Sequence, residues 1–166
     1  MADTVHLMPP MGRIALRGRP DDRGFRDAVA AVLGVPPPEP NVAVLGAVSV
    51  FWLQPSFWLV ECALEDAEAL TARLRDAVGE RGTTVEVSDT RITYALRGPD
   101  AARLLNKGCA LDLHPREFPV GRSALCAFAH LHALLVKTHD APVFQLTIPR
   151  GAQAHFEEWV RVAGAV

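Results

Sequence analysis

The sequence predicts an α+β fold built from two repeated strand-helix-strand-strand-helix units with mainly antiparallel sheets. The first observation is an internal repeat, because the run GRIALRG at 12–18 resembles TRITYALRG at 90–98. The second is that short polar turns join consecutive apolar runs, a connection typical of antiparallel strands. The third is size and composition, because 166 residues with 49% hydrophobic and 22% charged side chains suit one folded domain.

The first repeat, about residues 12–80, begins with the strand at 12–18. The segment Pro20-Asp21-Asp22 then starts a helix. Proline suits the first turn of a helix, and an aspartate side chain accepts hydrogen bonds from the free N–H groups of that turn. Two strands joined by a turn at 54–56 and a second helix follow, at 42–53, 57–64 and 66–78. Helical spacing places four apolar side chains on one face of that second helix: Ala67, Leu70, Leu74 and Ala77.

The second repeat, about residues 90–164, has the same order. Gly98-Pro99-Asp100 starts its first helix, and Gly108 is expected to end that helix as a C-cap. Two strands joined by a turn at 138–140 and a closing helix follow, at 122–137, 142–148 and 151–163. The closing helix buries Phe156, Trp159, Val160 and Ala163.

Two segments lie outside this pattern. The run VPPPEP at 35–40 predicts an exposed extended loop, because proline has no N–H to donate and is excluded from helix and strand interiors. The run at 83–88 predicts either a short additional strand or a linker between the repeats.

Charge and composition argue against several partners. The chain has 17 basic and 19 acidic residues, so it lacks the basic excess typical of nucleic-acid-binding proteins. The sequence has no apolar run long enough to predict a membrane span. The N-terminal sequence MADTVHLMPPMGR lacks the pattern of a secretory signal. The three cysteines, an odd number, fit reduced and buried thiols. We therefore expect a cytoplasmic protein without nucleic-acid or membrane partners.

The sequence contains no glycine-rich phosphate loop, no Cys-x-x-Cys, no His-Glu-x-x-His and no Gly-x-Ser-x-Gly motif. The first candidate site is the pair His130 and His132, because residues i and i+2 of a strand share one face and could bind a metal. Further ligands would come from His114, His139 or Asp140. We favour the alternative that the histidine pair is half buried on a sheet face or at a subunit contact.

Cys109 is the second candidate, as a nucleophile with His114 as its base. It follows a helix end rather than opening a helix, so nothing in the sequence marks its thiol as activated. We favour a structural interpretation, in which Leu111 and Leu113 pack beneath the turn that follows Gly108. No catalytic, cofactor-binding or metal-binding residue is therefore assigned.

Three segments of the second repeat resemble those of a known family: ALRGPDAARLL at 95–105, GCALDLHP at 108–115 and FPVG at 118–121. Together with the turn WLQPSFWL at 52–59 and PRG at 149–151, they are similar to the gamma subunit of heterotetrameric sarcosine oxidase. Gln54, Ser56 and Gly151 depart from the usual residues of that family.

The resemblance implies the fold of the folate-binding domain of the aminomethyltransferase, or glycine-cleavage T-protein, type. It also implies a noncatalytic structural subunit of an oxidoreductase complex that oxidatively demethylates sarcosine or a related N-methyl amino acid. That complex passes the one-carbon unit to tetrahydrofolate. FAD, FMN, NAD and tetrahydrofolate are then held by other subunits, and the partners of this chain are alpha, beta and delta subunits.

Two alternatives remain open. A stand-alone folate-binding one-carbon transfer protein would need a carboxylate to orient the folate amine, for which Asp89 and Asp112 are the candidates. A metal-dependent enzyme would instead use His130 and His132.

A partner interface is predicted at Arg150, Arg122 and Trp52. Arg150 stands at the start of the last helix, where a guanidinium opposes the helix dipole, so we expect a carboxylate to meet it. That carboxylate belongs either to a partner or to this chain, as Asp89 or Asp112. Trp52 is included because large aromatic residues often anchor subunit contacts.

Overall fold

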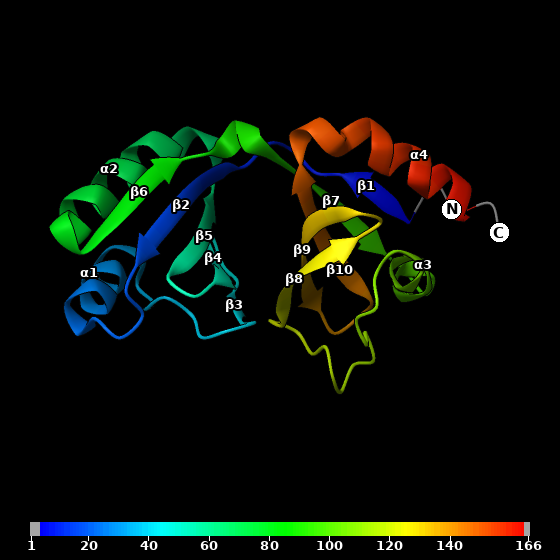
Figure 1. The fold of residues 1–166 in the computed structure, drawn as a ribbon, viewed down its shortest axis with the longest axis horizontal. Coiled ribbons are helices and arrows are strands. Elements are labelled where there is room, and N and C mark those ends of the chain that lie inside the picture. Colours follow the sequence, from blue (N-terminus) through cyan, green and yellow to red (C-terminus); the bar gives the residue numbers. More distant parts are fainter. Residues whose placement is uncertain (1–3, 165–166) are drawn as a thin grey trace. The chain divides into compact units, whose positions relative to one another are not determined.

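In the computed structural model, which describes residues 4–164, the chain divides into two compact units (Figure 1). The first unit contains Pro10–Ser88, and the second contains residues 4–9 together with residues 89–164. Each unit holds a five-stranded sheet in which every pairing is antiparallel. The predicted α+β class is therefore confirmed, and the predicted repeats fall one in each unit.

The first unit has the strand order β3-β4-β5-β2-β6. Its strands are β2 (Gly12–Gly18), β3 (Ala43–Val44), β4 (Ser49–Gln54), β5 (Phe57–Cys62) and β6 (Gly82–Glu86). Its helices are α1 (Arg23–Leu33) and α2 (Ala67–Val78), the latter preceded by the 3-10 turn Leu64–Asp66. The segment at 83–88 thus contributes a strand, the first of the two alternatives that the sequence left open.

The core of the first unit lies between one face of this sheet and its two helices. Ile14 and Trp58 from the sheet meet Phe25 of α1 and Leu74 of α2, and all four are 1% exposed or less. Asp22 caps α1 as predicted, because its Oδ1 accepts a hydrogen bond from the Phe25 N–H at 3.1 Å. The period of apolar residues and this cap together explain why helices form here.

The second unit has the order β1-β7-β10-β9-β8. Its strands are β1 (Val5–Leu7), β7 (Arg91–Arg97), β8 (Ser123–Phe128), β9 (Leu131–His139) and β10 (Val143–Pro149). Its helices are α3 (Ala101–Gly108) and α4 (Gln153–Gly164). The predicted face of the closing helix is confirmed, since all four of its residues belong to or pack against this core.

The two sheets repeat one pairing scheme. β2 lies between β5 and β6, and β7 lies between β10 and β1. Gly18 N–H donates to Ser56 O at 3.3 Å, and Gly98 N–H donates to Pro142 O at 3.1 Å, which aligns the two closing glycines. β1, from the start of the chain, therefore occupies in the second unit the place that β6 has in the first.

Three kinds of local expectation are wrong, and the first concerns two strands. The predicted strand at 122–137 is a hairpin, with β8 and β9 joined by Ala129 and His130 at φ 46° and 68°. Neither turn residue is the glycine or asparagine that such left-handed positions favour, so the sequence carried no turn signal. The predicted strand at 42–53 is likewise divided, into β3 and β4.

The proline run at 35–40 is the second correction. Pro37 and Pro38 are buried rather than exposed, and the Trp58 indole N–H donates a hydrogen bond to the Pro38 carbonyl at 2.9 Å. The loop is therefore fixed to the first core by a partner distant in sequence.

Gly108 is the third correction. It is the last residue of α3, and Cys109 is the C-cap in extended conformation, with φ −139°. A Cβ on Gly108 would lie 2.5 Å from the Phe128 ring, so glycine is needed here for close packing and not for a left-handed cap.

Candidate functional site

The histidine pair does not form the metal site that its spacing allowed, and both side chains are exposed rather than half buried as we favoured. His130 lies in the β8–β9 turn, and His132 lies on β9, so the two do not share one strand face. His114 Nδ1 accepts a hydrogen bond from the Arg116 N–H at 3.3 Å, and His139 contacts Thr138 Oγ1 at 3.0 Å. Within residues 4–164 no group of three or more His, Cys, Asp or Glu side chains could hold a metal ion.

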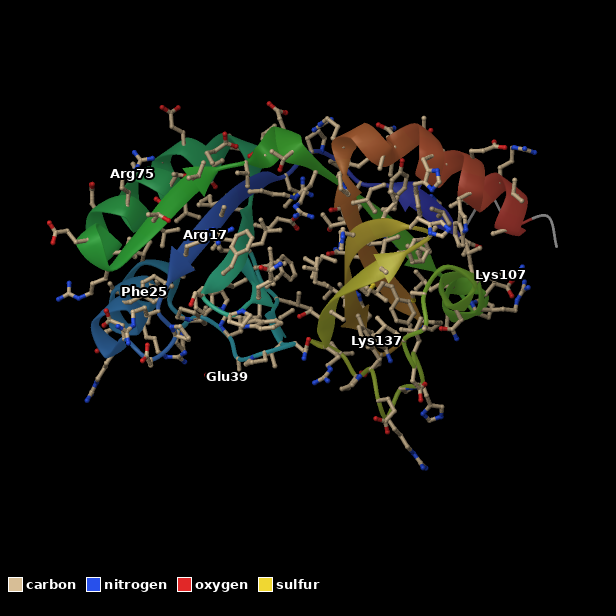
Figure 2. All side chains as sticks on the ribbon, in the orientation of Figure 1. Arg17, Phe25, Glu39, Arg75, Lys107 and Lys137 are labelled. Atoms are coloured by element: carbon tan, nitrogen blue, oxygen red, sulfur yellow. The ribbon has the colours of Figure 1, made fainter. Side chains whose placement is uncertain are left out.

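His130 instead lines a cleft of about 370 Å³ in the second unit. The His155 ring contacts the Ala129 carbonyl at 3.1 Å, which holds the left-handed turn against α4. Lys107 lies on the side of α3 that faces α4, where its ammonium donates a hydrogen bond to Ala163 O at 2.7 Å (Figure 2). The cleft therefore combines hydrogen-bonding side chains with one aromatic wall, and its full lining is Lys107, Gly108, Ala127, Ala129, His130, His155 and Trp159.

Cys109 has a cysteine as its partner. The Cys126 thiol donates a hydrogen bond to the Cys109 sulfur, and this bond lowers the pKa of Cys109 to about 6 against the opposing effect of burial. The same bond, followed by burial, raises the pKa of Cys126. The thiols are not all buried as predicted, because Cys109 and Cys126 are partly exposed and only Cys62 is buried.

Of the three residues predicted for an interface, Arg150 has a carboxylate nearby in its own unit. Its Nε donates to Asp89 O at 2.7 Å, and its terminal nitrogen lies 3.6 Å from Asp89 Oδ1. Arg122 is exposed beside the left-handed Gly121, and Trp52 is half-buried on β4 against the first core. The internal carboxylate is therefore Asp89, and the interface itself stays a prediction.

The two carboxylates of the folate alternative are both on the surface. Asp89 is the exposed partner of Arg150, and Asp112 Oδ1 accepts a hydrogen bond from the His114 N–H at 2.9 Å. Each of these groups already has a local structural role in the second unit.

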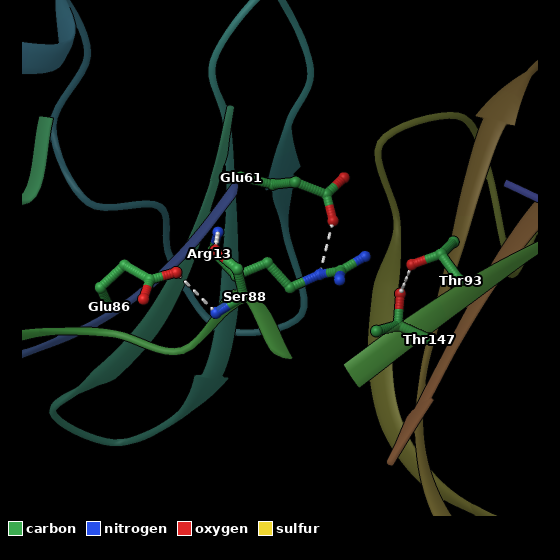
Figure 3. A network of polar contacts seen from close by, with 6 residues as sticks. All are labelled: Arg13, Glu61, Glu86, Ser88, Thr93 and Thr147. Atoms are coloured by element: carbon green, nitrogen blue, oxygen red, sulfur yellow. Dashed lines mark hydrogen bonds and ion pairs between the residues drawn. The ribbon is translucent and has the colours of Figure 1, made fainter. Parts of the chain in front are cut away.

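A buried ion pair in the first unit was not predicted from the sequence. The Arg13 Nε lies 3.0 Å from Glu61 Oε2, with side chains 2% and 8% exposed (Figure 3). Burial raises the pKa of Glu61, and the charge and hydrogen bond of Arg13 only partly offset that effect. The sequence contained a signal for this pair, because each of two apolar strands carries one charged residue near an end. Arg13 is the second residue of β2, and Glu61 is the next-to-last residue of β5.

Ser88 completes this polar group. The Arg13 backbone N–H donates to Ser88 Oγ at 2.9 Å, and the Ser88 N–H donates to Glu86 Oε1 at 2.9 Å (Figure 3). These bonds join the start of β2 to the end of β6, and the hydrogen bonds from Ser88 lower the pKa of Glu86.

A groove of about 500 Å³ runs along α2 in the first unit. Leu64, 47% exposed, stands at one of its walls, and Glu68, Arg75 and Glu86 supply charge. No helix in the part of the chain that the structure describes has the length and apolar character needed to cross a membrane.

Sequence comparison identifies a family. A profile described as the sarcosine oxidase, gamma subunit family matches residues 17–166. The sarcosine oxidase subunit gamma of Corynebacterium sp. (strain U-96) is 39% identical over 132 residues, which are 77% of this chain and 63% of that relative. The chain thus spans less than two thirds of the length of this curated relative.

Structural comparison agrees. A chain of heterotetrameric sarcosine oxidase from Corynebacterium sp. U-96, solved in complex with pyrrole 2-carboxylate, matches with a TM-score of 0.87 at 30% identity, over 96% of this chain and 82% of that chain. Aminomethyltransferase T of the glycine cleavage system from Bartonella henselae matches with a TM-score of 0.66 at 18% identity, over 94% and 45%. The second match confirms the predicted fold relationship. Since the family profile covers most of its length, the chain belongs to the sarcosine oxidase gamma subunit family.

Proposed function

We propose that this chain is a noncatalytic, structural subunit of a heterotetrameric sarcosine oxidase-like complex. The observation that carries the proposal is the family match over residues 17–166, together with the structural match to a chain of a heterotetrameric sarcosine oxidase. The partners would be alpha, beta and delta subunits, and we expect the complex to be cytoplasmic.

In this proposal the complex oxidatively demethylates sarcosine or a related N-methyl amino acid and transfers the one-carbon unit to tetrahydrofolate. FAD, FMN, NAD and tetrahydrofolate would be bound by the other subunits. The contribution of this chain would be assembly, through surfaces that include Arg150, Arg122 and Trp52.

The direct test is to isolate the tagged chain from its native cell and to identify its companions by mass spectrometry. We expect stoichiometric recovery of three further polypeptides, together with flavin absorbance. Recovery of the chain by itself at native expression levels, in low-salt buffer, would contradict the proposal.

A second test distinguishes the proposed structural subunit from a stand-alone folate-binding protein. The aminomethyltransferase-like fold favours that alternative only at the level of architecture, since the identity is 18%. Calorimetry of the full chain with tetrahydrofolate should detect no micromolar binding if folate belongs to another subunit. Micromolar binding that is lost in Asp89→Asn or Asp112→Asn would instead support a stand-alone one-carbon transfer protein.

A third test uses the chain without its companions. An obligate subunit exposes apolar surface when it is separated from its partners, so we expect the isolated chain to self-associate. A sharp monomer peak in gel filtration at high protein concentration, with a cooperative thermal transition, would count against an obligate subunit.

A further inference from the structure

A lysine lies almost completely buried near the end of β9 in the second unit (Figure 2). Lys137 is 4% exposed, and it continues the face of β9 on which Ala133 and Leu135 belong to the second core. On β10 it stands opposite Phe144, which is also buried. Lysine is almost never buried without a partner, because removing an ammonium group from water is costly. A group that compensates its charge is therefore expected nearby.

The neighbour of Lys137 on the opposite side is a second cation. The Gly121 N–H donates to Lys137 O at 2.9 Å, and the Lys137 N–H donates to Arg122 O at 3.1 Å. With Gly121 at φ 80°, these bonds form a β-bulge in which Gly121 and Arg122 together stand opposite Lys137. The next pair, Ser123 with Val136, is in regular register. Arg122 and Lys137 are therefore cross-strand neighbours on one face of the sheet.

No carboxylate among residues 4–164 compensates these two charges. Neither the Arg122 guanidinium nor the Lys137 ammonium takes part in an ion pair or a hydrogen bond within that range. Glu117 and Asp140, the acidic residues of the adjacent loops, are exposed and pair with neither cation. Like charges that stand opposite each other on adjacent strands destabilise a sheet. The second unit therefore keeps this pair at a cost in stability.

The surface beside the pair combines charge with an apolar side chain. Val120, which precedes the bulge glycine, is 42% exposed, and Arg122 is exposed. The turn that carries both is well defined, because the Arg122 N–H donates to Pro119 O at 3.0 Å and Gly121 supplies the left-handed position. Arginine is enriched in protein interfaces, where it often lies beside apolar groups. The turn therefore has the composition of a protein contact.

We propose that Arg122 and Lys137 together bind an aspartate or glutamate side chain of a partner subunit. The proposal rests on the proposed function, which supplies the partner. The Arg122 guanidinium offers paired N–H donors for a carboxylate at the surface, and the Lys137 ammonium adds a deeper point charge. A carboxylate bound by both cations removes their mutual repulsion, and Val120 packs against an apolar group of the same partner.

The pair differs from Arg150, the other arginine predicted for an interface. Arg150 has the Asp89 carboxylate at 3.6 Å, so its charge is already compensated within the second unit. Arg122 and Lys137 have no such partner among the described residues, and burial of Lys137 reduces screening by salt. A carboxylate of the partner should therefore contribute more to assembly at Arg122 and Lys137 than at Arg150.

The test isolates the tagged full chain with its companions from the native cell, as the wild type and as Arg122→Glu. The introduced carboxylate pairs with Lys137 within the chain and repels the carboxylate of the partner. We therefore expect recovery of the companions to fall by about tenfold or more. Arg23→Glu is the matched control, because it makes the same charge change at an arginine of α1 whose side chain is 94% exposed. This control should recover the companions as the wild type does.

A second readout separates docking from a role in folding. Arg122→Glu replaces a repulsive cross-strand pair with an attractive one, and Lys137→Met removes the buried charge while keeping most of the side-chain volume. The Tm of the purified chain should therefore stay the same or rise by about 2 °C in both variants. Lys137→Met should also reduce the recovery of the companions.

Two results would overturn the proposal. One is full recovery of the companions by Arg122→Glu, and the other is a Tm lowered by several degrees in Lys137→Met, which would assign the lysine an internal role. A wild-type chain that recovers no companions would contradict the proposed assembly itself and the docking with it. Failure of the docking site and failure of the proposed function are therefore distinguishable.

Discussion

The two units place chemically different residue pairs at equivalent positions of their two sheets. In the first unit Arg13 on β2 stands opposite Glu61 on β5, and their side chains form an ion pair at 3.0 Å. In the second unit Thr93 on β7 stands opposite Thr147 on β10, and their hydroxyls lie 2.8 Å apart (Figure 3). One backbone arrangement thus accepts either a charged or a neutral pair.

The comparison shows that the fold does not require the ion pair. The second unit builds the equivalent strand pairing with hydroxyls, which have a far smaller desolvation cost than two ions. Burial raises the pKa of Glu61 even though Arg13 is in contact with it, so desolvation outweighs attraction at this carboxylate. The ion pair is therefore weak evidence for stability, although breaking it should be costly.

The largest effect is expected for Glu61→Leu. This change leaves the Arg13 guanidinium buried without its carboxylate, so we expect the free energy of unfolding to fall by about 3–5 kcal/mol in urea titrations. The matched double change, Arg13→Met with Glu61→Leu, removes both charges and should cost little or even stabilise. A loss below about 1 kcal/mol for the single variant would show that the pair is not desolvated.

The next largest loss of stability is expected at the two positions where a phenylalanine ring packs directly on a glycine. A Cβ at Gly18 would lie 2.3 Å from Phe25, and one at Gly108 would lie 2.5 Å from Phe128. Both rings are completely buried, so Gly18→Ala and Gly108→Ala should each destabilise by about 1–3 kcal/mol in thermal or urea unfolding. Gly151→Ala is the control, because no atom lies within 4 Å of its Cβ position. Equal losses at Gly18 and Gly151 would refute this explanation.

Thr147→Val tests the neutral pair. The substitution keeps the shape but removes one hydroxyl, so we expect a loss of about 1–2 kcal/mol in the free energy of unfolding. Adding Thr93→Val should cost less than its effect in the wild type, because the first change has already removed the bond between the two hydroxyls. A single-variant loss as large as that of Glu61→Leu would remove the proposed difference between the units.

The ion pair should also make stability depend on pH, whereas the threonine pair should not. The folded-state pKa of Glu61 is raised, so its contribution is fully present below the unfolded pKa of about 4.3 and is lost as pH rises through the folded value. Wild-type stability should therefore fall relative to Glu61→Gln above about pH 4.5, by about 1 kcal/mol or less per pH unit. Thr147→Val should shift the curve without changing its slope, and parallel curves for all three proteins would contradict the assignment.

The smallest effect on stability is expected for Arg150→Ala. Its ion pair with Asp89 is exposed, with side chains 45% and 104% accessible, so the loss should be about 0.5 kcal/mol or less. Arg161→Ala, which breaks the exposed pair with Glu158 on α4, is the matched control. If Arg150 docks a partner, the pull-down should lose companions in this variant and not in the control. A lowered melting temperature with normal assembly would contradict the interface.

Local sequence signals were sufficient for most elements of the fold. The 3.6-residue period identified α2 and α4, and Asp22 marked the start of α1, because caps and amphipathic faces depend on near neighbours in the chain. The internal repeat anticipated two similar sheets, and three short segments of the second repeat identified the family. These features depend on residues at most a few turns apart, which a sequence displays directly.

The candidate sites depended on contacts that the sequence does not display. Spacing placed His130 and His132 on one strand face, but the left-handed turn at Ala129 and His130 moved His130 to the cleft beside α4. The effect of Cys126 on the pKa of Cys109 likewise joins residues that are remote in sequence. Both outcomes depend on side-chain packing between elements that are remote in sequence.

The sequence by itself determined the class, the order of the four helices and the family of this protein, because periodicity, caps and short motifs are local. Only the tertiary structure decided that β1 completes the second sheet, that Trp58 fixes the proline loop and that Arg13 meets Glu61. Each of these contacts joins residues far apart in the chain, and many alternative pairings satisfy the same local pattern. The choice among them follows from which arrangement buries the apolar faces while leaving buried polar groups paired.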